Sequence, residues 1–202
     1  MSHSKWIDKE YSKAIEKAVT EYNIEEFKQL QLNKGISDDD WAFNFMLIAA
    51  NKNLANSMQR LISAGYTCQY HYDNVILNAA SYNSVDVCKL LLDKASDEYI
   101  IQAFTNAVHN ECLEVIRCIY ATGKIPKDTI NYWLYYRQWD RRDRKLCKLL
   151  INLGADLSVI YNRNIPKFVN LGVKPEAFGN RSIFYTNLYL RYKCYYLNLI
   201  EN

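Results

Sequence analysis

Two cysteines and two histidines of this chain stand at spacings that could support metal binding or catalysis. Cys68 precedes His71 by three residues, and His109 precedes Cys112 by three residues. Two Cys and two His form a common ligand set for zinc, and a thiol beside an imidazole is the arrangement of a cysteine nucleophile with its base. Either chemistry depends on where the predicted helices place these four residues.

Motifs of established catalytic mechanisms do not occur in the sequence. The chain lacks the glycine-rich phosphate-binding loops, the G-x-S-x-G nucleophile elbow and the H-E-x-x-H zinc motif. The third histidine, His3, stands at the N-terminus. We therefore expect no enzymatic activity, no cofactor and no metal site.

The strongest local feature is the segment 132–145, YWLYYRQWDRRDRK. Aromatic rings interleaved with arginine can stack bases while the guanidinium groups hold phosphates, and they can equally form a hot spot for a protein partner. Its clustered cations are Arg141, Arg142, Arg144 and Lys145, and Asp140 and Asp143 partly offset them. A solvated structural turn, a protein contact and a nucleic-acid contact all remain open.

The elements that must position these residues follow from an internal repetition. Three segments align without a gap, namely Asn83–Ala95, Glu111–Gly123 and Arg142–Gly154. Each places apolar residues on one wide face of a predicted helix. One fixed position of the pattern always holds a cation, which is Lys89, Arg117 or Lys148.

A shorter predicted helix precedes each of these helices and carries an apolar residue followed by two small ones. The small pairs are Ala49-Ala50, Ala79-Ala80 and Ala107-Val108. Small side chains at these positions let two antiparallel helices approach closely. The apolar residues recur every 28 to 31 residues, at Ile15, Met46, Ile76, Phe104 and Tyr135.

This pattern resembles the ankyrin-repeat family, whose unit of about 33 residues is a β-turn followed by two helices. The resemblance covers residues 7–173 and is most specific in CLEVIRCIYATG and LCKLLINLGADL, within the second helices. The family's T-P-L-H at the start of the first helix is absent and the period is short. We therefore expect shortened β-turn fingers between the units. A different solenoid of helical pairs is the structural alternative.

The predicted fold is all-α: an ankyrin-like solenoid of about five to six helical pairs with capping helices at both ends. We expect a single domain over residues 1–202, with repeats and N-terminal cap in 1–173 and a C-terminal capping helix in 174–202. Ser4–Glu21 suits the first cap, and Arg181–Ile200, rich in Tyr and Leu, suits the second. A helix that lies on a membrane surface is the alternative for Arg181–Ile200.

The repeat phase separates the two Cys/His pairs. Cys68 and His71 fall in a predicted finger, whereas His109 and Cys112 fall in the turn at the opposite end of the first helices. About nine helical residues span roughly 13 Å, while bonds to zinc are about 2.0–2.3 Å long. A shared zinc site is therefore not expected, and the pair of His109 and Cys112 lacks a third group to orient it.

Composition indicates an ordered protein without a membrane span. Half of the 202 residues are hydrophobic, with only 6 Gly and 3 Pro, and no window offers about 18 uncharged apolar residues. The N-terminus lacks the apolar core of a signal peptide, so we expect a cytoplasmic protein with six reduced cysteines. We also expect the chain to be monomeric. Residues 1–100 hold a net charge of −4 and residues 101–202 a net charge of +7. Such asymmetry bears on partners rather than on the fold.

In ankyrin-repeat proteins, partners bind a concave face made by the fingers and by the exposed edge of the first helices. The corresponding positions of this chain's repeats can be found from the repeat spacing. On the predicted helices they are Asn51, Asn78, Ser81, Asn106, His109, Arg137 and Asp140. In the fingers they are Gln69, Tyr70, Tyr72, Glu98, Tyr99, Lys124 and Lys127. The tyrosines favour binding, because an exposed Tyr joins a large apolar surface to a polar end.

The resemblance implies a non-catalytic protein–protein interaction module that acts as an adaptor, scaffold or inhibitor. Divergent Tyr- and Asn-rich units of this kind are similar to ankyrin proteins of intracellular bacterial pathogens and large DNA viruses. An effector in the host cytoplasm is therefore one form of this prediction. The alternative is nucleic-acid binding through the basic aromatic C-terminal half, which a steep fall of affinity with salt would distinguish.

Overall fold

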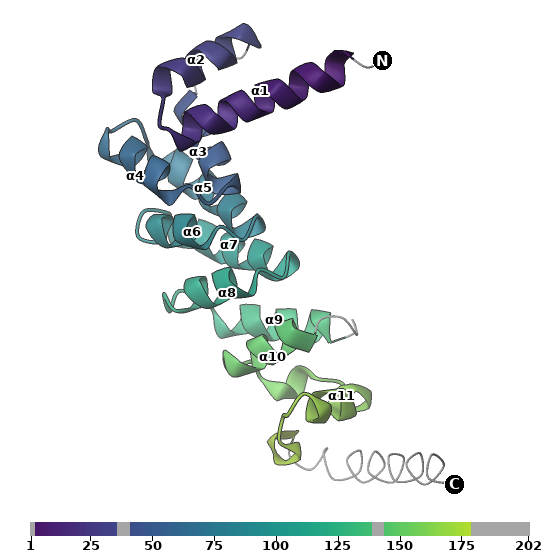
Figure 1. The fold of residues 1–202 in the computed structure, drawn as a ribbon. Helices are drawn as coiled ribbons and strands as arrows, with labels where there is room; N and C mark the ends of the chain where they lie inside the picture. The colour runs from purple at the N-terminus through teal and green to yellow at the C-terminus, as the bar shows by residue number, and fades with distance from the viewer. Residues whose placement is uncertain (1–2, 36–40, 139–143, 179–202) are drawn as a thin grey trace. The chain divides into compact units, whose positions relative to one another are not determined.

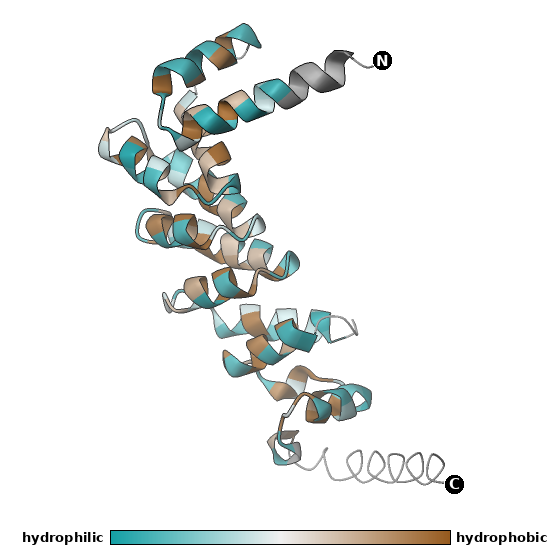
Figure 2. Ribbon diagram, viewed as in Figure 1, coloured by the Kyte–Doolittle hydropathy of each residue, from teal (hydrophilic) through white to brown (hydrophobic). Residues whose placement is uncertain are grey.

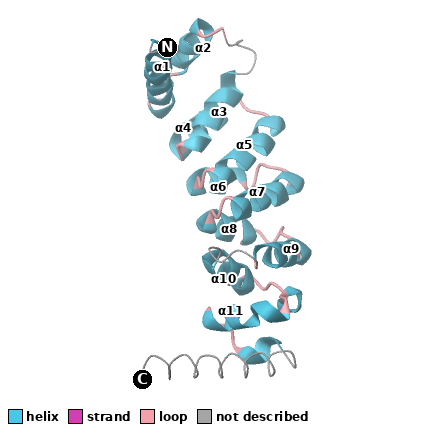
Figure 3. Cartoon of the chain, turned by 90° about the vertical axis from the view of Figure 1, so that its right-hand side faces the viewer, coloured by secondary structure: helices cyan, strands magenta, loops and turns pink. Residues whose placement is uncertain are grey.

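The computed structural model of the chain describes residues 3–35, 41–138 and 144–178, with residues 3–9 and 175 described by their backbone alone (Figure 1). Within these ranges all regular secondary structure is helical, which confirms the all-α prediction (Figure 3). The chain divides into two compact units, residues 1–125 and 126–202. In the described ranges, no helix has the length and apolar character needed to cross a membrane.

The first unit consists of helices that pack in consecutive pairs. In chain order they are α1 (His3–Thr20), α2 (Ile24–Asn33), α3 (Trp41–Asn51), α4 (Ala55–Ser63), α5 (Gln69–Ser81), α6 (Val85–Leu91), α7 (Asp97–His109) and α8 (Leu113–Tyr120). Helix α1 packs on α2, α3 on α4, α5 on α6, and α7 on α8. The first helices α3, α5 and α7 also pack side by side, as do the second helices α4, α6 and α8. From α3 onward, the unit therefore has two layers.

The small residues predicted to let neighbouring helices approach closely are fully buried. They are Ala49, Ala50, Ala79, Ala80, Ala107 and Val108. Because an alanine side chain adds one carbon, the backbones of neighbouring helices can come close. The larger side chains of the core follow the predicted phase, with Ile15, Met46, Ile76 and Phe104 all buried.

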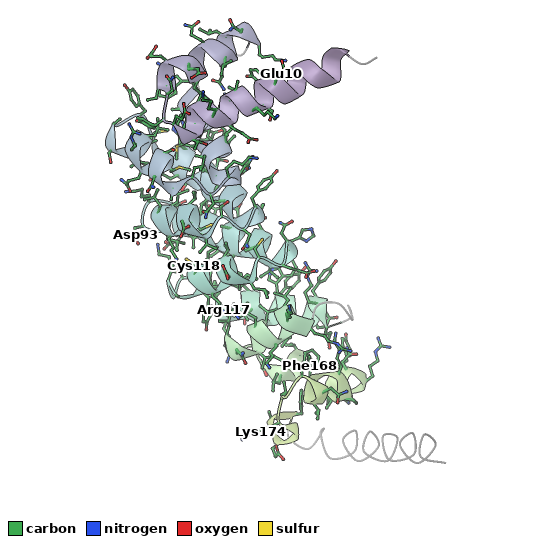
Figure 4. All side chains as sticks on the ribbon, in the orientation of Figure 1. Glu10, Asp93, Arg117, Cys118, Phe168 and Lys174 are labelled. Carbon is green, nitrogen blue, oxygen red and sulfur yellow. The ribbon has the colours of Figure 1, made fainter. Side chains whose placement is uncertain are left out.

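The second helices bury the apolar face that their sequences predict. Val87, Cys88 and Leu91 of α6 are buried, and so are Val115, Ile116 and Ile119 of α8. The cations that interrupt this pattern, Lys89 and Arg117, are exposed (Arg117 is labelled in Figure 4). Figure 2 shows both hydrophobic and hydrophilic residues on the second helices. The second helices are thus amphipathic and bury one face.

The turn inside each pair contains a residue with positive φ. These residues are Tyr22 at 56°, Asn53 at 54°, Asn83 at 57° and Glu111 at 57°. They recur with the same spacing of 28 to 31 residues as the buried apolar residues. Asparagine suits this left-handed conformation better than most residues, because its short polar side chain bonds locally.

Asn53 also connects its pair to the next one. Its Oδ1 accepts hydrogen bonds from the backbone N–H of Asp86 at 3.0 Å and of Val87 at 3.2 Å, and its Nδ2 donates to Asp86 Oδ2 at 2.9 Å. Ser84 Oγ donates to the carbonyl oxygen of Ala50. The unpaired N–H groups at the start of α6 are thereby satisfied by the preceding turn.

The second unit contains α9 (Lys127–Arg137), α10 (Arg144–Asn152) and α11 (Ile165–Asn170), with single 3-10 turns η2 (Leu157–Val159), η3 (Asn162–Asn164) and η4 (Pro175–Phe178). Helix α9 packs against α10 and η2, and α11 against η3. The predicted helix Arg181–Ile200 and the membrane-surface alternative lie outside the described residues.

One predicted core residue of this unit is wrong. Tyr135 was expected at the buried position of the fifth pair, but it is exposed, and its neighbour Leu134 is fully buried. Ile130, Trp133 and Leu134 form the buried face of α9. Their spacing of three and four residues is that of one helical stripe, and Tyr135 falls outside it.

Candidate functional site

The residues predicted to lie in fingers are mostly helical. Gln69, Tyr70 and Tyr72 lie in the first turn of α5, Glu98 and Tyr99 in that of α7, and Lys127 begins α9, whereas Lys124 lies in a connecting segment. The first helices are longer than expected, because α7 starts behind an extended Ser96 with two acidic residues in its first turn. The position of the fingers was therefore wrong, while the binding role of these residues stays a prediction.

Gln69 is held by contacts within the first unit. Its Nε2 donates to Asp73 Oδ1 at 2.9 Å and to the carbonyl oxygen of Lys94 at 2.9 Å. Asp73 is buried, and its Oδ1 also accepts from the backbone N–H of Ser96 at 2.7 Å and from Ser96 Oγ at 3.1 Å. These bonds fix the segment before α7. The sequence did not nominate Asp73.

Two more predicted finger residues have structural partners. The hydroxyl groups of Tyr72 and Thr67 are 2.6 Å apart, and Lys124 Nζ lies 2.8 Å from Asp97 Oδ1. In contrast, Tyr70 points away from the core, with 58% of its surface exposed. Of the finger candidates in α5, Tyr70 is thus the exposed aromatic residue.

The candidates on the first helices lie in both units. Asn51 and His109 are exposed at the ends of α3 and α7. Ser81 Oγ donates to the carbonyl oxygen of Leu77 at 2.9 Å, and Asn106 Nδ2 donates to the same oxygen at 3.4 Å. The structure thus brings Ser81 and Asn106 together between α5 and α7.

Asn78 is half-buried, and its Oδ1 is enclosed without a hydrogen-bond partner. Arg137 belongs to the second unit, where its guanidinium lies 5.7 Å from the ring centre of Trp133. Asp140 lies outside the described residues, as do Arg141 and Arg142 of the basic cluster. Arg144 and Lys145 are exposed in α10.

The structure reveals an aromatic surface at the start of α3 and α5, here named the α3–α5 aromatic surface. It consists of Trp41, Phe43, Tyr66, Tyr70 and His71. The rings of Phe43 and Tyr70 are 5.4 Å apart, those of Phe43 and His71 are 5.7 Å apart, and those of Trp41 and Tyr66 are 5.1 Å apart. All five residues keep partial or full exposure. Sequence analysis selected only Tyr70 as a partner-binding residue and named His71 only as a possible metal ligand or base. The ring contacts of this surface join residues 25 to 28 positions apart, which no sequence pattern pairs.

A second aromatic surface lies on α9 and is here named the α9 tyrosine surface. It consists of Tyr132, Tyr135, Tyr136 and Tyr161, all exposed. The hydroxyl groups of Tyr135 and Tyr161 are 2.9 Å apart, and this hydrogen bond raises the pKa of Tyr135. The aromatic segment singled out in the sequence therefore forms a surface as well as part of the core.

The thiol of the second Cys/His pair lies against backbone carbonyl groups. Cys112 is buried, and its Sγ contacts the carbonyl oxygens of Ser81 at 3.8 Å and of Asn110 at 3.6 Å. Burial raises the pKa of the Cys112 thiol, which disfavours the nucleophilic thiolate. Among the described residues, no three side chains of the His, Cys, Asp or Glu type gather as a metal site would require.

The described cysteines are free thiols in strongly different surroundings. Cys68 is exposed before α5, whereas Cys88 is buried in α6. Desolvation, with a smaller contribution from Cys118 and Cys112, raises the pKa of Cys88 to about 12.

Comparison of the chain with protein-family models, with curated proteins and with solved structures finds no match.

Proposed function

We propose that this chain is an ankyrin-like solenoid that binds a partner protein and has no catalytic activity of its own. Three features of the first unit support the solenoid: helices packed in consecutive pairs, fully buried small residues on the first helices, and a positive-φ turn in each pair. Units that contact only their neighbours build an extended surface, which is the usual binding surface of such proteins.

The observation that carries the binding function is the α3–α5 aromatic surface. Trp and Tyr are enriched at the positions that dominate the affinity of protein interfaces. Here the rings of Tyr66 and Tyr70 are anchored by Trp41 and Phe43, so that little side-chain freedom remains to be lost on binding. Lys28 Nζ lies 4.4 Å from the ring centre of Trp41 and provides a polar border.

The partner would be another protein of the compartment in which the chain acts. The proposal includes an adaptor, a scaffold or an inhibitor, and an effector that acts on a host protein in the host cytoplasm. A monomeric chain is expected in each case. The residues that we expect to touch the partner are those of the α3–α5 aromatic surface together with the exposed Asn51 and His109.

The test is affinity capture from nuclease-treated eukaryotic extract, followed by a titration with the purified captured protein. Tyr66→Ala/Tyr70→Ala should weaken binding by tenfold or more, since hot-spot truncations cost about 2 kcal/mol or more. Tyr82→Ala is the matched control, because Tyr82 also lies in the first unit and is 60% exposed, compared with 58% for Tyr70. Equal affinities for both variants and the unchanged chain would contradict the proposed surface.

A further inference from the structure

The outer face of α9 exposes tyrosines that the core does not need. Tyr132 and Tyr136 are each 57% exposed and Tyr135 is 42% exposed, while Trp133 and Leu134 fill the core side of the helix. An aromatic ring on an exposed helix position contributes little to stability. Three such rings within five residues therefore point to a ligand that contacts aromatic faces.

The rings of Tyr132 and Tyr136 are held nearly parallel. Their centres are 6.3 Å apart and their planes differ by 15°. Trp133 meets both rings edge-on, at 79° to Tyr132 and 87° to Tyr136, and supports them from the buried side. A planar ring can stack against either tyrosine without a change of the helix.

The side chain and the backbone carbonyl of the buried Gln138 hold Tyr161 and Lys167, respectively, at the C-terminal end of α9. Gln138 Oε1 accepts from the backbone N–H of Tyr161 at 2.8 Å and from Asn164 Nδ2 at 3.1 Å. Lys167 Nζ donates to the carbonyl oxygen of Gln138 at 3.0 Å. The ring of Tyr161 then lies 5.6 Å from that of Tyr135. Tyrosine rings and the Lys167 ammonium group thus share one end of the helix.

The charge of the second unit fits a polyanion. Residues 126–202 hold 13 basic and 6 acidic side chains, a net charge of +7. Arg137 follows Tyr136 directly, whereas Asp128 stands one helical turn before Tyr132. Phosphates are therefore favoured toward the C-terminal end of α9 and disfavoured at its start.

We propose that the α9 tyrosine surface binds single-stranded nucleic acid, with bases stacked on Tyr132 and Tyr136 and phosphates near Arg137 and Lys167. Stacking platforms beside cations are the general means of binding single strands without sequence preference. An acidic peptide would be attracted by the same charge, but its carboxylate side chains offer no aromatic ring to stack on the two tyrosines. This inference is independent of the partner protein proposed for the first unit.

The test is fluorescence anisotropy of the full chain with labelled 12-nucleotide oligo(rU) and oligo(dT), at 50 and 200 mM KCl. Binding of either strand should weaken with salt, by a slope of about −0.7 per phosphate contact. Tyr132→Ala/Tyr136→Ala should weaken it by roughly tenfold to a hundredfold, as expected for lost base stacking. Tyr132→Phe/Tyr136→Phe keeps the rings and should bind like the unchanged chain.

Tyr82→Ala is the control for loss of an exposed tyrosine elsewhere, and circular dichroism checks the fold of each variant. A crosslink between a 4-thiouridine oligonucleotide and residues 127–137 of the unchanged chain would support the proposal without any substitution. The proposal is overturned by absence of binding at 50 mM KCl, by equal binding of the alanine variant, or by crosslinks confined to other segments. Equally tight binding of poly-glutamate that depends on the two tyrosines would overturn it in favour of an acidic protein partner.

Discussion

The two units of the molecule bury their helices by the same rules but expose opposite charges. Residues 1–125 hold 12 basic and 16 acidic side chains, whereas residues 126–202 hold 13 and 6. Exposed aromatic rings pair across neighbouring helices in the first unit and along the single helix α9 in the second. Because the core depends on apolar spacing alone, the surface charge of each unit can suit a different class of partner.

The units also fix their connecting segments with comparable polar contacts. In the first unit, Asp73 of α5 accepts the backbone N–H of Ser96 at 2.7 Å. In the second, Asn131 of α9 accepts the backbone N–H of Asp156 at 2.7 Å. Asp73 precedes the buried Ile76 of α5 by three positions, and Asn131 precedes the buried Leu134 of α9 by three positions. In these two connections, a polar side chain of the first helix thus helps to hold the path of the chain.

The largest expected effect comes from truncating the core of each unit. Leu91→Ala in α6 and Leu150→Ala in α10 should each lower the free energy of unfolding by about 2–5 kcal/mol, because both side chains are fully buried. Scanning calorimetry measures the loss, and Leu32→Ala, at an exposed position, should change it little. An unchanged melting temperature for either core variant would mean that the packing is wrong.

Calorimetry of the same variants also sharpens the comparison of the units. If the units unfold independently, Leu150→Ala should shift one of two transitions and Leu91→Ala the other. A single transition that both variants shift equally would show that the units form one cooperative domain.

The next effect concerns two buried polar side chains that each accept a backbone N–H, Asp73 from Ser96 in the first unit and Gln138 from Tyr161 in the second. Asp73→Ala and Gln138→Ala should each cost about 1–3 kcal/mol, since both side chains are buried and each truncation leaves a partly buried backbone N–H without its partner. Hydrogen exchange locates the change: the amide of Ser96 should exchange faster in the first variant, and that of Tyr161 in the second. Gln59→Ala removes an exposed amide and serves as the control. If both amides exchanged faster in both variants, the effect of each substitution would not be confined to its own unit, and the prediction would be wrong.

The helical pairs of the first unit could be predicted because their signals are local. The alanine pairs before Asn51 and Ser81 and the apolar stripe of the second helices both recur within about 30 residues. In α9 the same reasoning misplaced the core, because apolar or aromatic residues occupy almost every position from Ile130 to Tyr136. Periodicity then cannot distinguish Leu134 from Tyr135.

The candidate surfaces were less predictable, because they depend on contacts between distant residues. Phe43 of α3 contacts His71 of α5, and Asp73 of α5 contacts Ser96, which directly precedes α7. The exposed Tyr70 was found through the resemblance to ankyrin repeats, but no pattern in a single sequence pairs it with Phe43. The predicted positions of the fingers were wrong, because capping and the charge of the first turn set the start of a helix more than the spacing of apolar residues does.

A smaller effect concerns the pH dependence of the first unit. The pKa of the Cys88 thiol is about 12, compared with an ordinary value of 9.0. Between pH 9 and 12 the unfolded chain loses a proton that the folded chain retains, so the free energy of unfolding falls as the pH rises. Below pH 9 this thiol has no effect. The slope is at most about 1.4 kcal/mol per pH unit for one thiol.

Urea unfolding at pH 8, 9 and 10 measures this slope. Cys88→Ala should flatten it above pH 9, whereas Cys68→Ala should leave it unchanged, because Cys68 is exposed. An identical slope in the Cys88 variant would show that the thiol reaches water in the folded chain.

The smallest effect tests whether Lys124 holds the first unit together or serves a partner. Lys124 Nζ lies 2.8 Å from Asp97 Oδ1, but the Asp97 side chain is 73% exposed. Solvent screening limits such a pair to about 0.2–1 kcal/mol. A double-mutant cycle with Lys124→Met and Asp97→Asn should give a coupling energy in that range at low salt and almost none at 1 M KCl. Partner affinity measured on the same variants then separates the roles, because a merely structural Lys124 would be replaceable by Met without loss of binding.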